Sequence, residues 1–205
     1  MKVILINGSP HQYGSTNRAL EEVKNELIKE KIDASILWIG TQVFGCTACN
    51  SCYESKKCIY DDCVNEIGEL LESIDGIVFG SPVYYASASG SMTSFLDRLF
   101  RSYSKKLEYK PGACISVARR AGTLSTFDQL NKYLAINSMP IVTSQYWNGV
   151  HGNNPLELEK DLEGLQTMRT LAKNMAWLLK SIDAGKKAGI KSPEQETRER
   201  TNFIR

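Results

Sequence analysis

The cysteines are the residues of this 205-residue chain whose spacing points most directly to chemistry. Five of the six lie between Cys46 and Cys63, and only Cys114 stands elsewhere. Four of the five follow the pattern Cys-x2-Cys-x2-Cys-x5-Cys. Cysteines this dense, in a chain long enough to fold without disulfides, favour metal or redox chemistry over a disulfide framework.

A loop rich in small and hydroxyl residues follows the first apolar run and spans residues 7–17. Its backbone N–H groups can surround a phosphate, and the helix that follows adds the positive end of its dipole. The loop has neither the lysine of a Walker loop nor a Gly-x-Gly-x-x-Gly fingerprint, so a phosphate monoester such as that of FMN fits best. An ordinary turn with a Ser or Thr helix cap is the alternative. The candidate phosphate-binding residues are Ser9, His11, Ser15, Thr16 and Asn17.

Two further loops, residues 80–90 and 118–123, each follow an apolar run and suit a flat ring system. A ring needs close backbone approach and apolar or aromatic cover. An arginine in the second loop would hold the N1–C2=O edge of a flavin, which becomes negative on reduction. A proline-containing turn and solvated arginines are the alternatives. The candidate ring-binding residues are Pro82, Val83, Tyr84, Tyr85, Ser87, Ala118, Arg119, Arg120 and Gly122.

These loops must be positioned by the elements between them. Continuous apolar runs predict buried parallel strands, and apolar residues three or four apart predict helices over 19–28, 92–100 and 158–182. The alternation predicts an α/β fold, a flavodoxin-like three-layer sandwich with a five-stranded parallel sheet of order 2-1-3-4-5. Ligands bind such sheets outside the carboxyl ends of the strands, where the three loops would meet. The expected strands are Val3–Ile6, Ile36–Ile39, Ile77–Phe79, Cys114–Val117 and Ile141–Val142.

Composition and charge exclude several classes of protein. The chain is 42% hydrophobic and 23% charged, which fits one globular domain over 1–184 with a cysteine-rich insertion at 45–63. No apolar run is long enough for a membrane span, and the N-terminal run is too short for a signal peptide, so we expect a cytoplasmic protein. The net charge of +2 arises in the tail at 185–205, leaving no basic surface for nucleic acid. Ile190, Phe203 and Ile204 among the tail's charges favour an arm that packs on a neighbouring subunit.

The three loops together resemble the NADPH-dependent FMN reductase family. The resemblance rests on Gly8-Ser9-Pro10 with Gly14-Ser15-Thr16-Asn17, on Gly80–Tyr85 and on Phe95-Leu96-Asp97-Arg98, and it covers about residues 1–150. It implies FMN with its phosphate on residues 9–17 and its ring against residues 82–85 and 118–122. It also implies a homodimer or homotetramer in which the ring lies near a subunit interface.

The cysteine spacing resembles the compact motif of the iron–sulfur flavoproteins within this family. That likeness implies a [4Fe–4S] cluster that exchanges electrons with FMN. The run differs from the ferredoxin motif in its last spacing and lacks a proline after its fourth cysteine. A structural zinc site, a cluster-free loop and simple burial of some thiols stay open as alternatives. The expected metal ligands are Cys46, Cys49, Cys52 and Cys58.

The function expected is an oxidoreductase that passes electrons through FMN from ferredoxin or NAD(P)H to an acceptor. A cluster-free NAD(P)H:FMN or quinone reductase, and a non-enzymatic electron carrier, are the alternatives. No Gly-x-Ser-x-Gly elbow or Ser/His/Asp set is present, and we assign no catalytic side chain because the flavin performs the chemistry. His151 follows the last expected strand and is a further candidate for lining the same pocket, with a structural role as the alternative.

Overall fold

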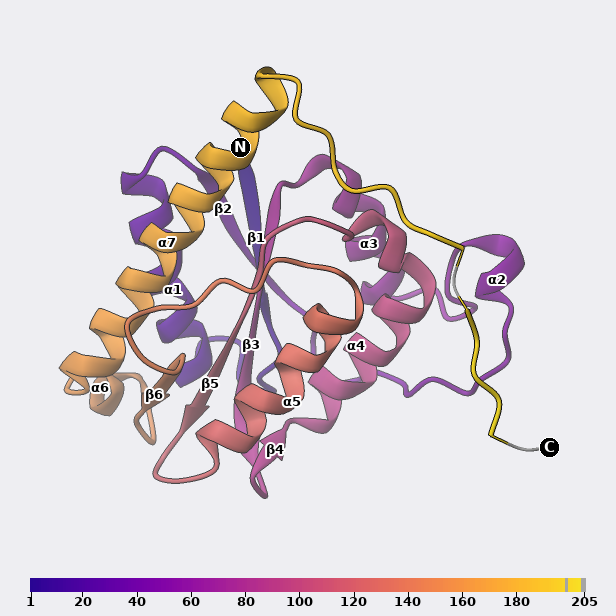
Figure 1. Ribbon diagram of the computed structural model, residues 1–205. Helices are drawn as coiled ribbons and strands as arrows, with labels where there is room; N and C mark the ends of the chain where they lie inside the picture. Colours follow the sequence, from indigo (N-terminus) through magenta and orange to yellow (C-terminus); the bar gives the residue numbers. More distant parts are fainter. Residues whose placement is uncertain (198, 204–205) are drawn as a thin grey trace.

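A parallel sheet with helices on both faces forms the molecule (Figure 1). The computed structural model describes residues 1–197 and 199–203. The strands are β1 Lys2–Asn7, β2 Asp33–Trp38, β3 Gly76–Tyr84, β4 Ser87–Ala88, β5 Gly112–Ala118 and β6 Gly149–His151. The helices are α1 Ser15–Lys29, α2 Cys52–Ser55, α3 Cys63–Leu70, α4 Gly90–Tyr103, α5 Thr123–Ile136, α6 Pro155–Leu158 and α7 Leu162–Lys187, with 3-10 turns at Leu71–Ser73 and Ser104–Lys106.

The strand order is β2-β1-β3-β5-β6, and all of these strands run parallel. The short strand β4 folds back antiparallel on the end of β3 and lies off this path. Apart from β4, the order is the predicted 2-1-3-4-5, so the predicted topology is confirmed. Because parallel strands all end at one edge, the loops after β1, β3, β5 and β6 lie together.

The predicted fifth strand is misplaced. Ile141 forms only an isolated bridge with Gly112, whereas the edge strand β6 pairs with the far end of β5 at Ser116–Ala118. Between these two contacts the chain leaves the sheet. Asn148 then bonds to β5 as a strand residue would, since its carbonyl accepts from the Ser116 N–H at 3.0 Å. Its Nδ2 donates to the Cys114 carbonyl at 3.1 Å. The edge position is therefore filled by two short stretches, which apolar character alone does not reveal.

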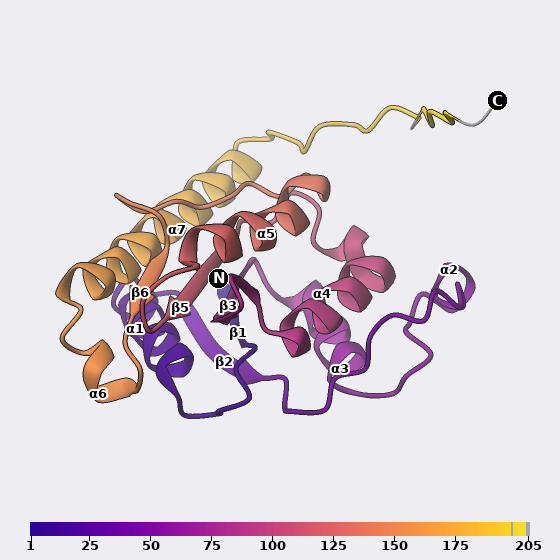
Figure 2. The ribbon, with the colours of Figure 1, turned by 90° about the horizontal axis from the view of Figure 1, so that it is seen from below.

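The two faces of the sheet carry separate apolar cores. Val3 and Leu5 of β1 face one core with α1 and α7, while Ile4 and Ile6 face the other with α3, α4 and α5. Viewed from below, α1 and α7 lie on one side of the strands and α3 and α4 on the other (Figure 2). Each fully buried aliphatic side chain contributes about 1.5–3 kcal/mol, so these cores hold the strand ends in fixed positions.

The long helical pattern at the C-terminal end divides in two. Leu158 ends the short helix α6, and α7 begins at Leu162, where the Asp161 carboxylate accepts a hydrogen bond from the Gly164 N–H at 2.9 Å. Among the described residues, no helix is both long and apolar enough to cross a membrane.

Residues 185–187 of the predicted tail belong to α7. From residue 188 on, the described part of the tail contains neither helix nor strand and extends away from α7 toward the side of the molecule that carries α2 (Figure 1). It contacts its own chain where the Gln195 amide donates to the Tyr109 hydroxyl at 2.6 Å. Ile190 and Phe203 are exposed, and Ile204 lies outside the described residues. Packing on a neighbouring subunit stays a prediction.

Candidate functional site

A crevice of about 710 Å³ opens at the carboxyl ends of β1, β3, β5 and β6. Its volume is within the range of small-molecule sites. The loop after β1 forms one wall, the end of β3 another, and the segments after β5 and β6 the third. The predicted residues that line it are Ser9, His11, Ser15, Thr16, Pro82, Val83, Tyr84, Ala118 and Arg119.

The loop after β1 is held in one conformation by the side chain of Asn7. The Asn7 Oδ1 accepts from the Ser9 N–H at 3.0 Å, and its Nδ2 donates to the Gln12 carbonyl at 3.0 Å. The Trp38 indole donates to the Ser9 carbonyl at 2.7 Å. Because three independent bonds fix the loop, the groups that line the crevice are already in place before a ligand binds.

Helix α1 begins at this loop with its first turn open to the crevice. Gly14 precedes it in an extended conformation, and no side chain among the described residues caps it by a hydrogen bond. Its first turn also contains no acidic residue. An uncapped N-terminus leaves backbone N–H groups and the positive end of the helix dipole for an anion, which suits a phosphate.

The wall opposite is apolar and rigid. Pro82 and Val83 lie near the end of β3, which ends at Tyr84, and a tight turn with positive φ at Tyr85 (49°) and Ala86 (58°) leads into β4. Gly122 packs against that turn with φ of +90°, and a Cβ there would lie 2.7 Å from Val83. Only glycine fits this close approach, so Gly122 supports the wall from behind rather than lining the crevice.

Four other predicted residues also lie outside the crevice lining. The Asn17 amide donates to Glu21 at 2.8 Å along α1, and the Ser87 hydroxyl donates to Gln129 of α5 at 2.8 Å. Tyr85 and Arg120 are exposed beyond the mouth of the crevice. Of the two adjacent arginines, the structure therefore brings only Arg119 to the crevice.

The sequence prediction missed the segment that follows β6. Gly152, Asn153, Asn154 and Pro155 line the crevice together with the loop after β1. Only the loops after the first, third and fourth expected strands are predicted at the crevice, and the fifth strand is predicted at Ile141–Val142, well before this segment. The available signal was the Asn-Asn-Pro turn directly after the Gly149–His151 stretch.

The cysteine segment forms a second, smaller cavity away from the crevice, against α4. Cys46, Cys49, Cys52 and Cys58 all line it, together with Arg98. Among the described residues, no three His, Cys, Asp or Glu side chains lie close enough together to hold a single metal ion. The four thiols therefore surround one space without converging on one point.

The thiols of this chain differ in their surroundings. Hydrogen bonding by Ser51 lowers the pKa of the exposed Cys49 thiol below its usual value. Burial raises the pKa of Cys63 to about 11, and burial raises that of Cys114 further. Burial therefore keeps the Cys63 and Cys114 thiols protonated at neutral pH.

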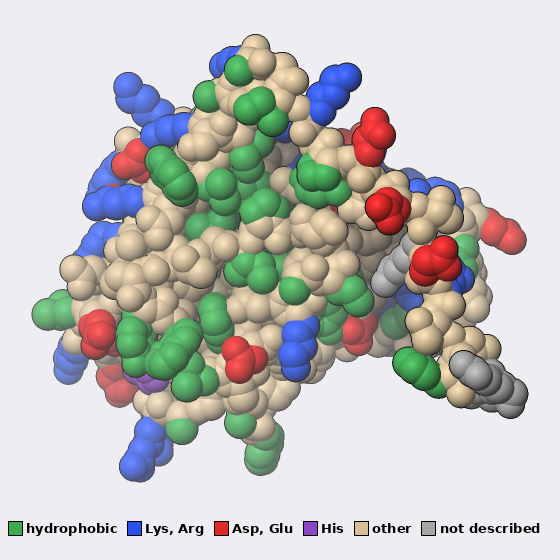
Figure 3. Space-filling view, viewed as in Figure 1, with side chains coloured by type: hydrophobic (Ala, Val, Ile, Leu, Met, Phe, Trp, Pro, Cys, Tyr) green, Lys and Arg blue, Asp and Glu red, His purple; other side chains and the backbone are tan. Residues whose placement is uncertain are grey.

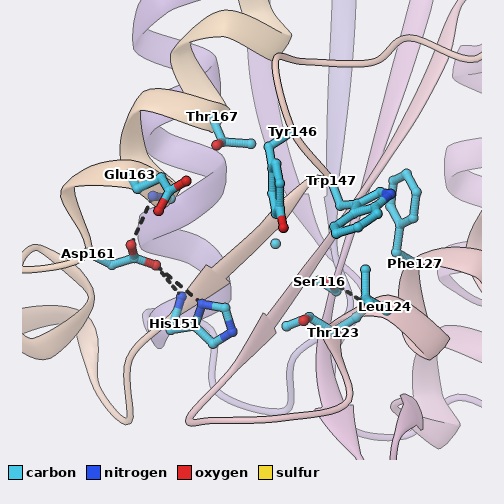
Figure 4. Close-up of a pocket in the computed structure, with 12 residues that line it drawn as sticks. Ser116, Thr123, Leu124, Phe127, Tyr146, Trp147, His151, Asp161, Glu163 and Thr167 are labelled. Atoms are coloured by element: carbon cyan, nitrogen blue, oxygen red, sulfur yellow. Dashed lines mark hydrogen bonds and ion pairs between the residues drawn. The ribbon is translucent and has the colours of Figure 1, made fainter.

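His151 lines neither the crevice nor the cysteine cavity. It borders a cavity of about 270 Å³ at the edge of the sheet, walled by the aromatic rings of Phe127, Tyr146 and Trp147 (Figure 4). Asp161 accepts from the His151 backbone N–H at 2.7 Å and lies 3.5 Å from its Nδ1. Hydrophobic side chains show at the surface beside a histidine in this region (Figure 3).

Comparison with known proteins identifies the family of the chain. The profile of the NADPH-dependent FMN reductase family matches residues 1–154. The chain belongs to this family. It is 32% identical over 191 residues to an iron–sulfur flavoprotein of Methanocaldococcus jannaschii, covering 89% of this chain and 99% of that one. It is 29% identical over 189 residues to an iron–sulfur flavoprotein of Methanosarcina thermophila, covering 89% and 97%.

The fold assignment is confirmed in the same way. An archaeal flavodoxin structure superposes with a TM-score of 0.60 at 15% identity, covering 88% of this chain and 99% of that one. The predicted family and the flavodoxin-like fold are thus both correct.

Proposed function

We propose that this family member is an FMN-dependent oxidoreductase with a [4Fe–4S] centre in its cysteine segment. The observation that carries the FMN assignment is the crevice: an uncapped helix N-terminus faces an apolar wall across a volume that suits a mononucleotide. A phosphate at the open first turn of α1 would satisfy N–H groups that no side chain among the described residues caps.

The residues of the crevice divide the task of holding FMN. Ser15 and Thr16 at the start of α1 would donate to the phosphate, and Pro82 and Val83 would cover the ring. Arg119 would lie toward the edge of the ring that becomes negative on reduction. Bound FMN accepts a hydride or single electrons and passes them on, while the side chains bind it, orient it and balance its charge.

The cysteine quartet supplies the ligand set that a [4Fe–4S] cluster takes from protein. A cubane is bound by four cysteine thiolates. Cys46, Cys49, Cys52 and Cys58 line one cavity. In the proposed centre each of these four thiolates would hold one iron.

We assign ferredoxin or NAD(P)H as the electron donor, and a homodimer or homotetramer as the assembly. Tyr85 is fully exposed at the tip of a fixed turn beside the crevice, which supports its covering by a second subunit. Sedimentation of the holoprotein tests the assembly, and a monomer at micromolar concentration would contradict it.

Two measurements on anaerobically purified protein test the function. The first is FMN per chain by titration and absorption, with one expected and none refuting the assignment. The second is iron and sulfide per chain, with about four of each expected for a cubane. Fewer than about two irons per chain would refute the cluster and favour the second candidate function, an NAD(P)H:FMN or quinone reductase without a cluster. The exposure of the free thiols Cys46 and Cys49 supports this second candidate. Oxidation of NAD(P)H or of reduced ferredoxin then identifies the donor, and the absence of both rates would indicate an electron carrier.

A further inference from the structure

Arg98 projects from α4 into the cysteine segment and is 1% exposed. Its Nε donates to the Cys58 sulfur at 3.1 Å. Its Nη1 donates to Asp62 at 2.7 Å and to the Phe44 carbonyl at 3.3 Å. Its Nη2 donates to the other Asp62 oxygen at 2.9 Å and to the Tyr60 carbonyl at 3.3 Å. All five donors of the guanidinium are thus used, and every acceptor belongs to one segment of chain.

The acceptors stand on both sides of the cysteine quartet. Phe44 precedes its first cysteine, whereas Tyr60 and Asp62 follow its last. The rings of Phe44 and Tyr60 stack with centroids 5.5 Å apart, and the Arg98 guanidinium lies 5.0 Å from the centre of the Tyr60 ring. One side chain therefore closes the loop that contains all four cysteines.

The same contacts fix one cysteine more firmly than the others. The Cys58 N–H donates to Asn65 Oδ1 at 2.9 Å, and Asn65 Nδ2 donates back to the Cys58 carbonyl at 2.9 Å. With its backbone held by Asn65 and its sulfur by Arg98, Cys58 is fixed in place. Cys46 and Cys49 are exposed and lie in a stretch without helix or strand.

Arg101, one turn further along α4, provides a contrast. Its guanidinium donates to the Asn50 side chain at 2.6 Å and lies 5.0 Å from the centre of the Tyr53 ring. It borders the same cavity but donates to no thiol among the described residues. The two arginines place similar charge beside the quartet, and only Arg98 adds an N–H···S bond.

We propose that Arg98 is the positioning residue of the cysteine centre: it closes the segment before metal binds and raises the reduction potential of the bound cluster through its bond to Cys58. This inference rests on the proposed cluster. An added electron increases the negative charge on the cluster sulfurs, and an N–H donor to a ligand sulfur stabilises that form. Arginine alone supplies the planar fork that binds Asp62 in a bidentate manner while its Nε reaches the thiolate.

The first arm of the test uses the metal-free full chain and trypsin, which cleaves after the exposed Lys56 and Lys57 within the segment. Arg98→Lys and Asp62→Asn break the fork while retaining the charge at position 98. Both are expected to be cleaved several-fold faster at these lysines than the wild type. Cleavage at the wild-type rate would overturn the closing role. Circular dichroism and FMN titration of each variant serve as controls for folding.

The second arm measures the cluster midpoint potential by anaerobic titration of the reconstituted protein. Arg98→Gln and Arg98→Lys are expected to shift it to more negative values, and Arg101→Gln to shift it less than either. If Arg98→Lys keeps the wild-type potential, or if Arg101→Gln shifts it as far as Arg98→Gln does, charge rather than the N–H···S bond sets the potential and the proposal fails. Should Arg98→Gln not fold, Arg98→Lys decides alone.

The outcomes separate this inference from the proposed function. A wild-type chain that takes up no iron overturns the cluster and the potential-setting role together. Normal iron with unchanged proteolysis and unchanged potential in the variants overturns the role of Arg98 alone.

Discussion

Replacing Ser15 by aspartate is expected to weaken FMN binding while stabilising the protein without ligand. Ser15 is the first residue of α1, and this end of the helix has neither a side-chain cap among the described residues nor an acidic residue in its first turn. A carboxylate there favours the helix by about 0.3–1 kcal/mol through its dipole. The same carboxylate lies where a phosphate must bind, so the two measured quantities change in opposite directions.

The size of the binding loss follows from charge and hydrogen bonding. A carboxylate about 5 Å from a phosphate dianion costs about 1.7 kcal/mol even at the dielectric constant of water. Loss of the hydroxyl donor adds about 1 kcal/mol. The sum of nearly 3 kcal/mol corresponds to a dissociation constant about 100-fold higher.

Fluorescence titration of FMN against the apoprotein measures this change. Ser15→Asn is the matched control, because it has the shape of aspartate without the charge, and it is expected to lose no more than about tenfold. Raising the salt concentration should reduce the aspartate effect, since salt screens partly exposed charges. An aspartate variant that binds FMN as the wild type does, with the expected gain in melting temperature, would refute the phosphate assignment to the start of α1.

Three further outcomes are expected. Cys49→Ala should lose iron but keep FMN, whereas Cys63→Ala should keep both, and loss of FMN with Cys49→Ala would mean that the segment is mainly structural. Gly122→Ala places a side chain at φ of +90° against the β3–β4 turn, so thermal unfolding should show a loss of about 1–3 kcal/mol. A loss of unfolding free energy below about 0.5 kcal/mol would contradict this, because it would mean that the β3–β4 turn shifts to accommodate the added side chain. The hydrogen bond from Lys29 holds the pKa of Glu26 below its usual 4.5. The ionised Glu26 carboxylate therefore stabilises the folded protein fully above pH 4.5, and this contribution is lost as the pH falls through the folded-state pKa. Glu26→Gln should flatten this part of the acid-unfolding curve, and an unchanged acid limb would contradict the assignment.

Much of the crevice was predictable because strand ends in a parallel sheet meet at one edge. Knowing that residues 3–6, 77–79 and 114–117 are strands is enough to bring Ser9, Pro82 and Ala118 together. The residues after β6 were missed because the edge strand is divided between Ile141 and residues 149–151. An edge strand bonds on one side only, and its position depends on side-chain bonds such as that of Asn148, which have no periodic signal.

The local sequence by itself determined the α/β alternation and the dense cysteine spacing, because each depends on residues close together in the chain. The sheet order followed from that alternation through the general topology rules of parallel α/β sheets. The structure, rather than the sequence, shows that no side chain among the described residues caps the start of α1. Only the tertiary structure decided which arginine faces the crevice, that Gly122 supports its wall, and that the guanidinium of Arg98 lies among residues 44–62. Each of these depends on contacts between residues about 36 or more positions apart, whose register is set by how whole helices pack on the sheet. No local pattern of residue types encodes that register.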